Sequence, residues 1–275
     1  MKTIIAPTDF SSAAHNAVDY AVELAKFFNS RLILVNAYHP TPPADYEFAY
    51  TVELSTVLKN NSVEKLNDLK NEICKKNGRE LDIKCISEMG FSYDTIKAVA
   101  EKYDANLVVM GIVGEAGKIK KHLIGSTAIK VARDLDVPTF IIPENVKYHR
   151  IHKISFACDF KKTENTDLIY VAKFFSKVFD AELEIVNVEK PKEFISIDKA
   201  VTNLFIEEKL EHVRHKTVHI TGNNVALELE DYFHTYESDV IMINPKKHNL
   251  FYYLFNHSIT KELAYNARLP VLAIH

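Results

Sequence analysis

Glycine is scarce in this chain, with seven residues in 275, and tryptophan is absent. Four of the seven glycines nevertheless fall within fifteen residues, at Gly111, Gly114, Gly117 and Gly125. Glycine lets the backbone take a positive φ and lets a ligand approach without a Cβ in the way. A cluster of this kind in a glycine-poor chain indicates a loop that holds a ligand.

Cysteine is also scarce, and its three positions, Cys74, Cys85 and Cys158, include no C-x-x-C spacing. An odd number without that spacing fits neither a disulfide framework nor a zinc knuckle, so we expect ordinary thiols. The H-E-x-x-H and G-x-S-x-G signatures are missing as well. We place His212 and His215 on one face of a helix, where their charged neighbours favour a solvated face over a metal site. The sequence therefore predicts no metal ligands and no catalytic residues.

Charge of one sign and long apolar runs are both lacking. The formal net charge is −3, with 26% charged residues, which gives no electrostatic reason to expect nucleic acid or a membrane surface as a partner. No apolar run approaches the ~20 residues that span a bilayer. The first run, Ile4–Ala6, ends at Pro7, too soon for a signal peptide. We expect a cytoplasmic protein.

Alternation of strand and helix patterns is the main feature of the first half. Continuous apolar runs such as Leu32–Val35 are typical of strands that a parallel sheet buries on both faces. Regular alternation of strands with helices predicts a doubly wound, mostly parallel, five-stranded sheet of the Rossmann-like α/β class. The expected strands are 3–8, 31–37, 82–87, 107–111 and 138–142, and the expected helices start at Ser11 or Ser12 and span 51–76, 92–103 and 125–135.

The same order then repeats in the second half. Residues 153–160 echo 3–10, so that Asp159 stands opposite Asp9, and residues 170–187 echo 20–36. Residues 241–243 stand opposite 108–110, and 269–272 opposite 137–140. Four matches in one order predict an internal duplication, with one domain over 1–146 and a second, shorter one over 147–275.

The two copies differ at the glycine-rich loop. Opposite Gly111, Gly114 and Gly125 the second copy has Asn244, Lys247 and His257. Side chains at these positions would occupy space that a phosphate needs. The aromatic segment 251–255 is suited to packing rather than to holding an anion. We therefore expect an intact loop in the first domain and a degenerate one in the second.

The first-domain loop leads into a helix that starts near Ser126 and Thr127. Free N–H groups at a helix N-terminus favour phosphate, and hydroxyl side chains are common there. A basic stretch inside the loop, Lys118–His122, is either a phosphate clamp or a solvated face. The sequence thus indicates an anionic ligand at this loop.

The duplicated order, the aspartate after the first strand, and G-x-x-G followed by G-S-T together resemble a tandem universal stress protein. The resemblance covers nearly the whole chain and implies two domains of the adenine nucleotide alpha hydrolase-like fold. The usual family motif has nine residues between its second and third glycines, whereas Glu115–Ile124 supplies ten here.

The resemblance implies ATP, or ADP or AMP, with Mg²⁺, at the carboxyl ends of the first-domain strands. Asp9 would contact the adenosine end, Gly111 and Gly114 would pass under the ribose and α-phosphate, and Gly125 would help to hold the outer phosphates. The complete set of implied nucleotide contacts is Pro7, Thr8, Asp9, Ala37, Met110, Gly111, Gly114, Gly125, Ser126 and Thr127.

Simpler explanations remain open for several of these residues. Asp9 is equally suited to be a turn residue or cap before the first helix. Gly111 is equally suited to mark close packing of a strand on a helix. The proline-rich loop 39–43 is either a lid or only a connection.

The resulting functional hypothesis is a non-enzymatic or barely enzymatic, ATP-binding, stress-response or signalling protein with nucleotide in the first domain only, in which weak ATP hydrolysis stays open. One alternative is an interaction or dimerisation module that binds no nucleotide. Another is a hydrolase that splits nucleotide at the α-phosphate, although the S-G-G-x-[DS] loop of such relatives is absent at Ala6–Ser11. We expect strands 138–142 and 270–274 to pair within the chain, which would cover two sheet edges, and a homodimer is a further expectation.

Overall fold

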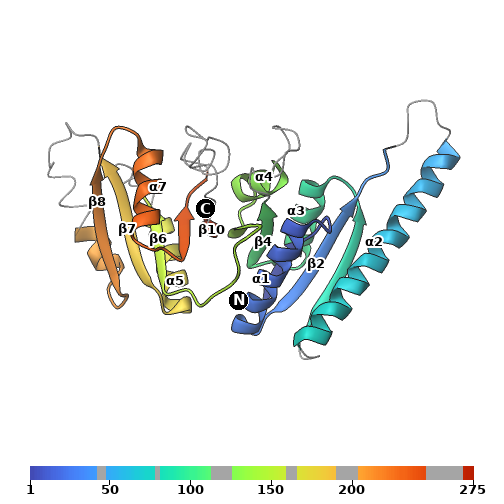
Figure 1. Ribbon diagram of the computed structural model, residues 1–275, viewed down its shortest axis with the longest axis horizontal. Helices are drawn as coiled ribbons and strands as arrows, with labels where there is room; N and C mark the ends of the chain where they lie inside the picture. The colour runs from blue at the N-terminus through green and yellow to red at the C-terminus, as the bar shows by residue number, and fades with distance from the viewer. Residues whose placement is uncertain (42–47, 78–80, 113–125, 159–165, 190–203, 246–268) are drawn as a thin grey trace. The chain divides into compact units, whose positions relative to one another are not determined.

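The computed structural model describes residues 1–41, 48–77, 81–112, 126–158, 166–189, 204–245 and 269–275 (Figure 1). The chain divides into two compact units, Met1–Tyr148 and His149–His275. In the parts of the chain so described, no helix has the length and hydropathy that a membrane crossing requires.

Unit 1 is built on a parallel sheet of five strands in the order β3-β2-β1-β4-β5. The central strand β1 is buried at Ile4, Ile5 and Ala6, which explains why its sequence is continuously apolar rather than alternating. The predicted doubly wound α/β fold is confirmed. The strands are β1 (Thr3–Pro7), β2 (Arg31–Tyr38), β3 (Ile83–Met89), β4 (Leu107–Ile112) and β5 (Thr139–Pro143).

Helices follow the first four strands of unit 1. The first begins after Ser11, whose Oγ accepts the N–H of Ala14 at 3.3 Å, and it ends at Asn29 in the left-handed conformation. α3 and α4 pack against each other and share an apolar cluster with the sheet. The helices are α1 (Ser12–Phe28), α2 (Phe48–Asn77), α3 (Ser92–Lys102) and α4 (Ser126–Asp134).

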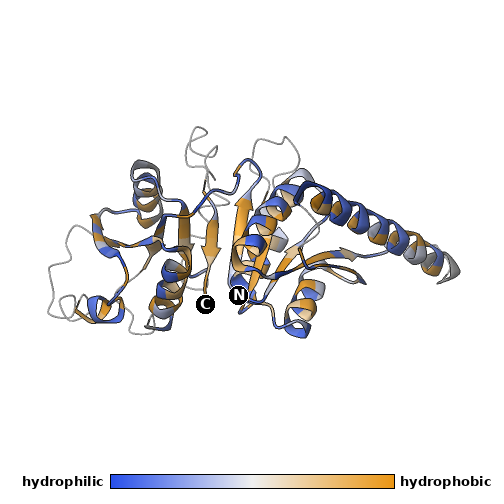
Figure 2. Cartoon of the chain, turned by 90° about the horizontal axis from the view of Figure 1, so that it is seen from below, coloured by the Kyte–Doolittle hydropathy of each residue, from blue (hydrophilic) through white to orange (hydrophobic). Residues whose placement is uncertain are grey.

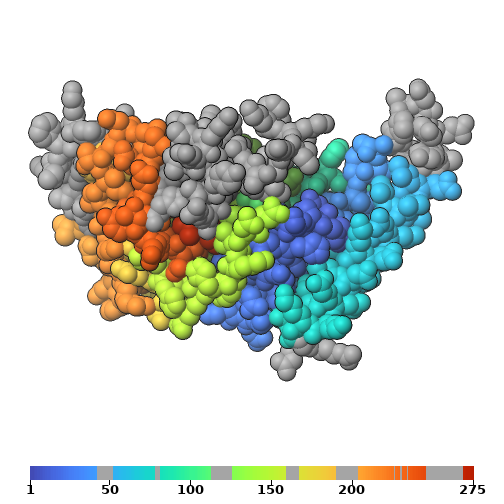
Figure 3. Space-filling view, in the orientation of Figure 1, coloured from blue at the N-terminus to red at the C-terminus, as the bar shows by residue number. Residues whose placement is uncertain are grey.

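Helix α2 is much longer than the sheet that it covers. Its second half packs on β2 and β3 through Leu66, Leu69 and Ile73, which are buried. Its first half continues past the strands, with Val52 and Val57 exposed (Figures 1 and 2). In the space-filling view its residues, light blue to cyan, lie at the surface of unit 1 (Figure 3).

Unit 2 has the same sheet topology. Its strands are parallel in the order β10-β9-β6-β7-β8, which matches β5-β4-β1-β2-β3. Within the described ranges its elements are β6 (Lys153–Ala157), α5 (Thr166–Phe179), β7 (Glu182–Glu189), β8 (His215–Thr221), α7 (Val225–Thr235), β9 (Val240–Ile243) and β10 (Val271–Ala273).

The two units also share details of backbone pairing. β1 pairs with β2 in the same register as β6 with β7. Asn36 Nδ2 donates to the carbonyl of Thr8 at 2.7 Å, and Asn187 Nδ2 donates to the carbonyl of Cys158 at 2.8 Å. The residue that follows the first strand is thus held in the same way in both units.

Several element boundaries differ from prediction by one to three residues. β3 runs on to Met89, because its ladder with β2 continues through Tyr38. β4 continues through Ile112, and β5 extends to Pro143 because Pro143 pairs with Ile112. Helix α2 already starts at Phe48.

The helix predicted around His212 and His215 is wrong. His212 takes a positive φ of 68°, and His215 begins β8, which pairs with β7. The chain therefore turns before His215 and continues as a strand. The strand is held by backbone hydrogen bonds to β7, and its mixed polar sequence does not display that pairing locally.

Candidate functional site

The centre of the unit 1 sheet is a topological switch point. From β1 the chain proceeds to β2 and β3 on one side, and afterwards to β4 and β5 on the other. The connections from β1 and β4 consequently leave in opposite directions at the carboxyl edge, where open α/β sheets bind ligands. β1 ends there at Pro7, and β4 ends there at Ile112.

The turn after β1 is closed by its own side chains. Thr8 is buried, its N–H donates to the carbonyl of Val35 at 2.8 Å, and its Oγ1 accepts the N–H of Phe10 at 3.0 Å. Asp9 is exposed, and its Oδ1 accepts the N–H of Ser11 at 3.0 Å. Asp9 therefore has a local role as a turn residue before α1, and its carboxylate lies at the surface of the carboxyl edge.

Gly111 lies in β4 directly beneath the first turn of α1. A Cβ at this position would be 2.2 Å from the carbonyl oxygen and 2.5 Å from the carbonyl carbon of Ala13. Both are backbone atoms, so a side chain here requires the helix to move. Close packing of strand on helix is thus sufficient to explain this glycine.

Two further predicted residues lie in the strands. Met110 is buried in the apolar cluster that α3 and α4 share with the sheet, so its side chain serves the core. Ala37 is half-buried in β2 and pairs with Glu88. Pro7, buried at the end of β1, pairs with Val35.

The remaining predicted residues belong to the glycine-rich loop and its helix. Ser126 and Thr127 are the first two residues of α4, exposed and half-exposed respectively. Gly114, Gly125 and the basic stretch 118–122 lie outside the described residues.

A buried polar network lies beneath the edge, and we did not predict it from the sequence. Ser62 Oγ of α2 donates to Asn36 Oδ1 at 2.7 Å, and Ser87 Oγ of β3 donates to Ser62 Oγ at 2.7 Å. Since Asn36 also donates to Thr8, the network joins the ends of β1, β2 and β3 to α2. The recurrence of asparagine at Asn36 and Asn187 was the available signal.

Ser62→Ala is expected to lower the free energy of unfolding by about 1 to 3 kcal/mol, because it leaves the buried oxygen of Asn36 without its donor. Urea denaturation followed by circular dichroism would measure it. Ser55→Ala on the same helix, whose exposed hydroxyl lies 3.5 Å from the sulfur of Met89, should change stability by about 0.5 kcal/mol or less. Equal effects of the two variants would contradict the structural role of the network.

A carboxylate already lies at the N-terminus of α1. Ser12 Oγ donates to Glu144 Oε1, and the N–H of Glu144 donates to the carbonyl of Ile112 at 3.1 Å. The positive end of a helix favours a negative charge. Glu144 therefore supplies at α1 the negative charge that a phosphate would bring.

The described residues contain no group of three or more His, Cys, Asp or Glu side chains that could hold a metal ion. Ser126 and Thr127 bring two hydroxyl groups to the start of α4.

Comparison with known proteins gives matches in one family. The model of the universal stress protein family matches residues 1–143. A universal stress protein of Methanocaldococcus jannaschii is 30% identical over 152 residues, which cover 53% of this chain and 84% of that protein. One of Synechocystis is 28% identical over 142 residues, which cover 52% of this chain and 85% of that protein.

Solved structures agree on the fold. A universal stress protein from Archaeoglobus fulgidus has a TM-score of 0.69 at 21% identity, covering 99% of this chain and 97% of that chain. The similarity therefore extends through both units. With the family model matching more than half of the residues, the chain belongs to the universal stress protein family.

Proposed function

We propose that this chain is an adenine-nucleotide-binding protein of stress response or signalling, which holds ATP, ADP or AMP at the carboxyl edge of unit 1. The observation that carries the proposal is the switch point between β1 and β4 in a member of this family, with Asp9 just after β1 and Gly111 in β4. We propose a binding protein and assign no catalytic residue.

In this proposal the adenosine lies over the ends of β1 and β2. Pro7, Thr8 and Ala37 surround the adenine, and the exposed Asp9 carboxylate accepts hydrogen bonds from the adenosine. Met110 and Gly111 take part through their backbone, since the Met110 side chain is in the core.

The phosphates belong at α4 rather than at α1 in the same proposal. The Glu144 carboxylate contacts Ser12 at the N-terminus of α1, whereas Ser126 and Thr127 bring two hydroxyl groups to the start of α4. Gly114 and Gly125 of the preceding loop complete the site, and Mg²⁺ accompanies the phosphates. A helix N-terminus contributes only about 0.3 to 2 kcal/mol, so most of the affinity comes from hydrogen bonds and adenine burial.

We propose that nucleotide binds to the first domain only. Opposite Gly111 the second domain has Asn244, a buried side chain where the first domain has none. The other substituted loop positions, Lys247 and His257, lie outside the described residues and extend the same asymmetry.

Mg-ATP is expected to raise the melting temperature of the purified protein, because a ligand at ~100 times its Kd stabilises the folded state by ~2.7 kcal/mol. Gly114→Val should abolish the shift, since it puts a branched side chain under the phosphates. Lys247→Ala, at the matching position of the second domain, should leave it intact. Equal sensitivity of the two variants would rule out binding in the first domain alone.

An interaction module without nucleotide is the second candidate, and one observation favours it. Asp9 and Gly111 each have a structural role that needs no ligand, in the turn before α1 and in the packing of α1 on β4. Mass spectrometry of small molecules released from freshly denatured protein separates the two candidates. Co-purified ATP, ADP or AMP would eliminate the interaction module.

We also propose that strands 138–142 and 270–274 pair within the chain and that whole chains associate as homodimers. The two strands stand at corresponding ends of the two five-strand orders. Pairing would cover edges that otherwise promote aggregation.

A further inference from the structure

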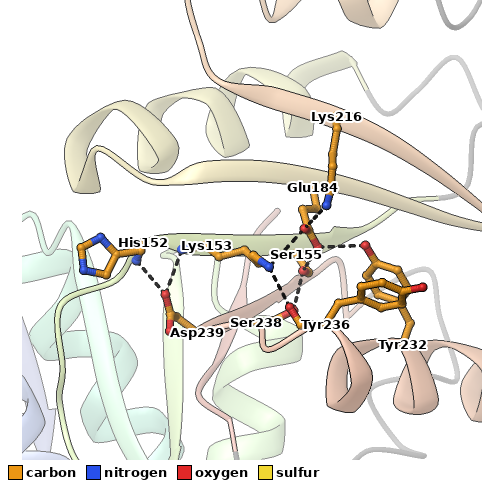
Figure 4. A network of polar contacts seen from close by, with 9 residues as sticks. All are labelled: His152, Lys153, Ser155, Glu184, Lys216, Tyr232, Tyr236, Ser238 and Asp239. Atoms are coloured by element: carbon orange, nitrogen blue, oxygen red, sulfur yellow. Dashed lines mark hydrogen bonds and ion pairs between the residues drawn. The ribbon is translucent and has the colours of Figure 1, made fainter.

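The core of unit 2 contains a buried, charged cluster centred on Glu184 of β7 (Figure 4). The Glu184 side chain has no exposed surface. Lys216 Nζ of β8 lies 2.6 Å from Glu184 Oε1, and Lys153 Nζ of β6 lies 3.6 Å from the same oxygen. Both lysines are partly exposed, so each reaches inward from the surface to the carboxylate.

Hydroxyl groups complete the cluster on the second carboxylate oxygen. Ser155 Oγ of β6 and Tyr232 OH of α7 each donate to Glu184 Oε2 at 3.0 Å. Ser238, just before β9, lies 2.6 Å from Ser155 Oγ. Burial alone raises the pKa of Glu184, but the bonds from Lys216, Tyr232 and Ser155, together with Lys153, outweigh it and hold the pKa below its usual value. Four elements and one turn of unit 2 thus meet at an ionised carboxylate.

The corresponding place in unit 1 is apolar. Glu184 pairs with Ser155 and Lys216 across the sheet, and the residues in the same register of unit 1 are Ile33, Ile5 and Lys84. Ile5 and Ile33 are fully buried in one cluster with Val99 of α3.

Val99 is the counterpart of Tyr232. Thr3 and Lys153 are the first residues of β1 and β6. Asn106 accepts the N–H of Thr3, and Asp239 accepts the N–H of Lys153, so Asn106 and Asp239 occupy equivalent positions in the two units. Val99 precedes Asn106, and Tyr232 precedes Asp239, by the same seven positions. The unit 1 lysine, Lys84, lies over the ring of Tyr103, with Nζ 4.6 Å from the centroid, instead of pairing with a carboxylate.

We propose that the Glu184 cluster is a recognition device for folding, which makes the strands and helix of unit 2 assemble with one another rather than with their unit 1 counterparts. The backbones cannot discriminate, because β1–β2 and β6–β7 have the same register and both pairs are parallel. Only the side chains distinguish a correct pairing from an exchanged one.

Each exchange of strands leaves a buried polar group without a partner. With β7 in the place of β2, Glu184 would still have a lysine beside it, Lys84. Its second carboxylate oxygen would face Ile5 and Val99 in place of two hydroxyl donors, and a buried acceptor without a donor is unfavourable. With β2 in the place of β7, Ile33 would face the hydroxyls of Ser155 and Tyr232, which would lose their acceptor.

Net stability is a weaker explanation for the cluster. Replacing a buried ion pair by apolar residues of similar volume is often neutral or stabilising, whereas fixing register and partner is its best-attested use. Unit 1 fills the same position with isoleucine and valine. The cluster therefore distinguishes two otherwise similar sets of elements.

The test exchanges three residues between the units in the full chain. The first graft gives unit 2 the unit 1 residues: Ser155→Ile, Glu184→Ile and Tyr232→Val. After dilution from denaturant at rising protein concentrations, the fraction that regains the elution volume of untreated protein is measured by size-exclusion chromatography. We expect this graft to lower the recovered fraction several-fold and to yield larger species, while the denaturation midpoint stays at or above that of the natural protein.

The reciprocal graft, Ile5→Ser with Ile33→Glu and Val99→Tyr, makes both units polar and should also lower recovery. A chain with both grafts restores the difference between the units and should recover better than either graft alone. Recovery of the first graft equal to that of the natural protein would overturn the proposal, as would a double graft, folded or not, that recovers no better than the single grafts.

Glu184→Gln is the control for lost stability. It removes the charge but keeps a buried polar group, so the units remain distinguishable and recovery should stay near that of the natural protein. A fall in recovery as large as that of the first graft would show that stability, not recognition, governs refolding.

Discussion

Gly111→Ala is expected to destabilise unit 1 by about 3 kcal/mol, because overpacking a site without free volume forces backbone shifts. The new Cβ would lie 2.2 Å from the carbonyl oxygen of Ala13, and neither that atom nor its carbon can rotate away. Relief requires the first turn of α1 to lift from β4. Amide hydrogen exchange of the β4 segment, followed by mass spectrometry, would report the loss for unit 1 separately from unit 2.

Ile112→Val, the next position in the same buried strand, is the matched control. It removes one methylene group from a side chain that is 3% exposed, which costs about 0.5 to 1.5 kcal/mol. If Gly111→Ala costs no more than this control, α1 does not press on β4 as closely as the structure indicates.

The same contact limits how Gly111 can be used in tests of nucleotide binding. A variant that lifts α1 also disturbs Ser11, Ser12 and the turn that holds Asp9. Loss of binding in Gly111→Ala would therefore not distinguish a ligand contact from damage to the fold. Gly114→Val is the more informative substitution because it keeps the glycine at position 111, where a Cβ would meet the backbone of Ala13.

Glu184→Gln is expected to lower the free energy of unfolding of unit 2 by about 3 kcal/mol at pH 7, because it weakens charge-assisted bonds and leaves two lysines without a buried carboxylate. Urea denaturation at several pH values, with exchange of the β7 segment as the local probe, would measure it. Glu182→Gln in the same strand, where the side chain is partly exposed, should change stability by about 0.5 kcal/mol or less.

The difference in stability between the natural protein and Glu184→Gln depends on pH with a defined sign. The folded-state pKa of Glu184 lies below its ordinary value of 4.5, so the unfolded chain takes up the proton first as the pH falls. The contribution of Glu184 is therefore complete above about pH 4.5 and declines as the pH falls through the folded-state pKa. The natural protein and Glu184→Gln should converge in stability in acid. A difference that is constant from pH 7 to strong acid would contradict an ionised Glu184.

The alternation of strands and helices was predictable because the signal is local. Runs such as Leu32–Val35 are apolar over consecutive residues, and Ser11 and Asn29 mark the start and end of α1 within its own sequence. Local signals of this kind fix the fold class, and the family resemblance that follows from them is confirmed. β8 was missed because its residues alternate irregularly and its strand character comes from pairing with β7.

The sequence predicts a position for the candidate site, but it does not give the structural role of each residue there. The glycine cluster and the aspartate after β1 predict a site at the carboxyl edge of the sheet by their order alone. Whether Gly111 serves packing depends on how close Ala13 comes, and whether Asp9 serves the turn depends on the direction of one N–H group. Neither the distance between Gly111 and Ala13 nor the direction of that N–H group can be predicted from the spacing of residues.

The sequence alone thus determined the doubly wound α/β fold class, because the alternation of strand and helix patterns is local. It also predicts a glycine-rich loop in the first domain and its loss in the second. Only the tertiary structure decided that Asn36, Ser62 and Ser87 form one network and that Glu184 is ion-paired rather than misplaced in an apolar strand. The hydrogen-bond partners of Glu184 are 29 and 48 residues away along the chain. Folding brings these residues together through the sheet and α7, and no periodic pattern of neighbouring residues predicts contacts at such separations.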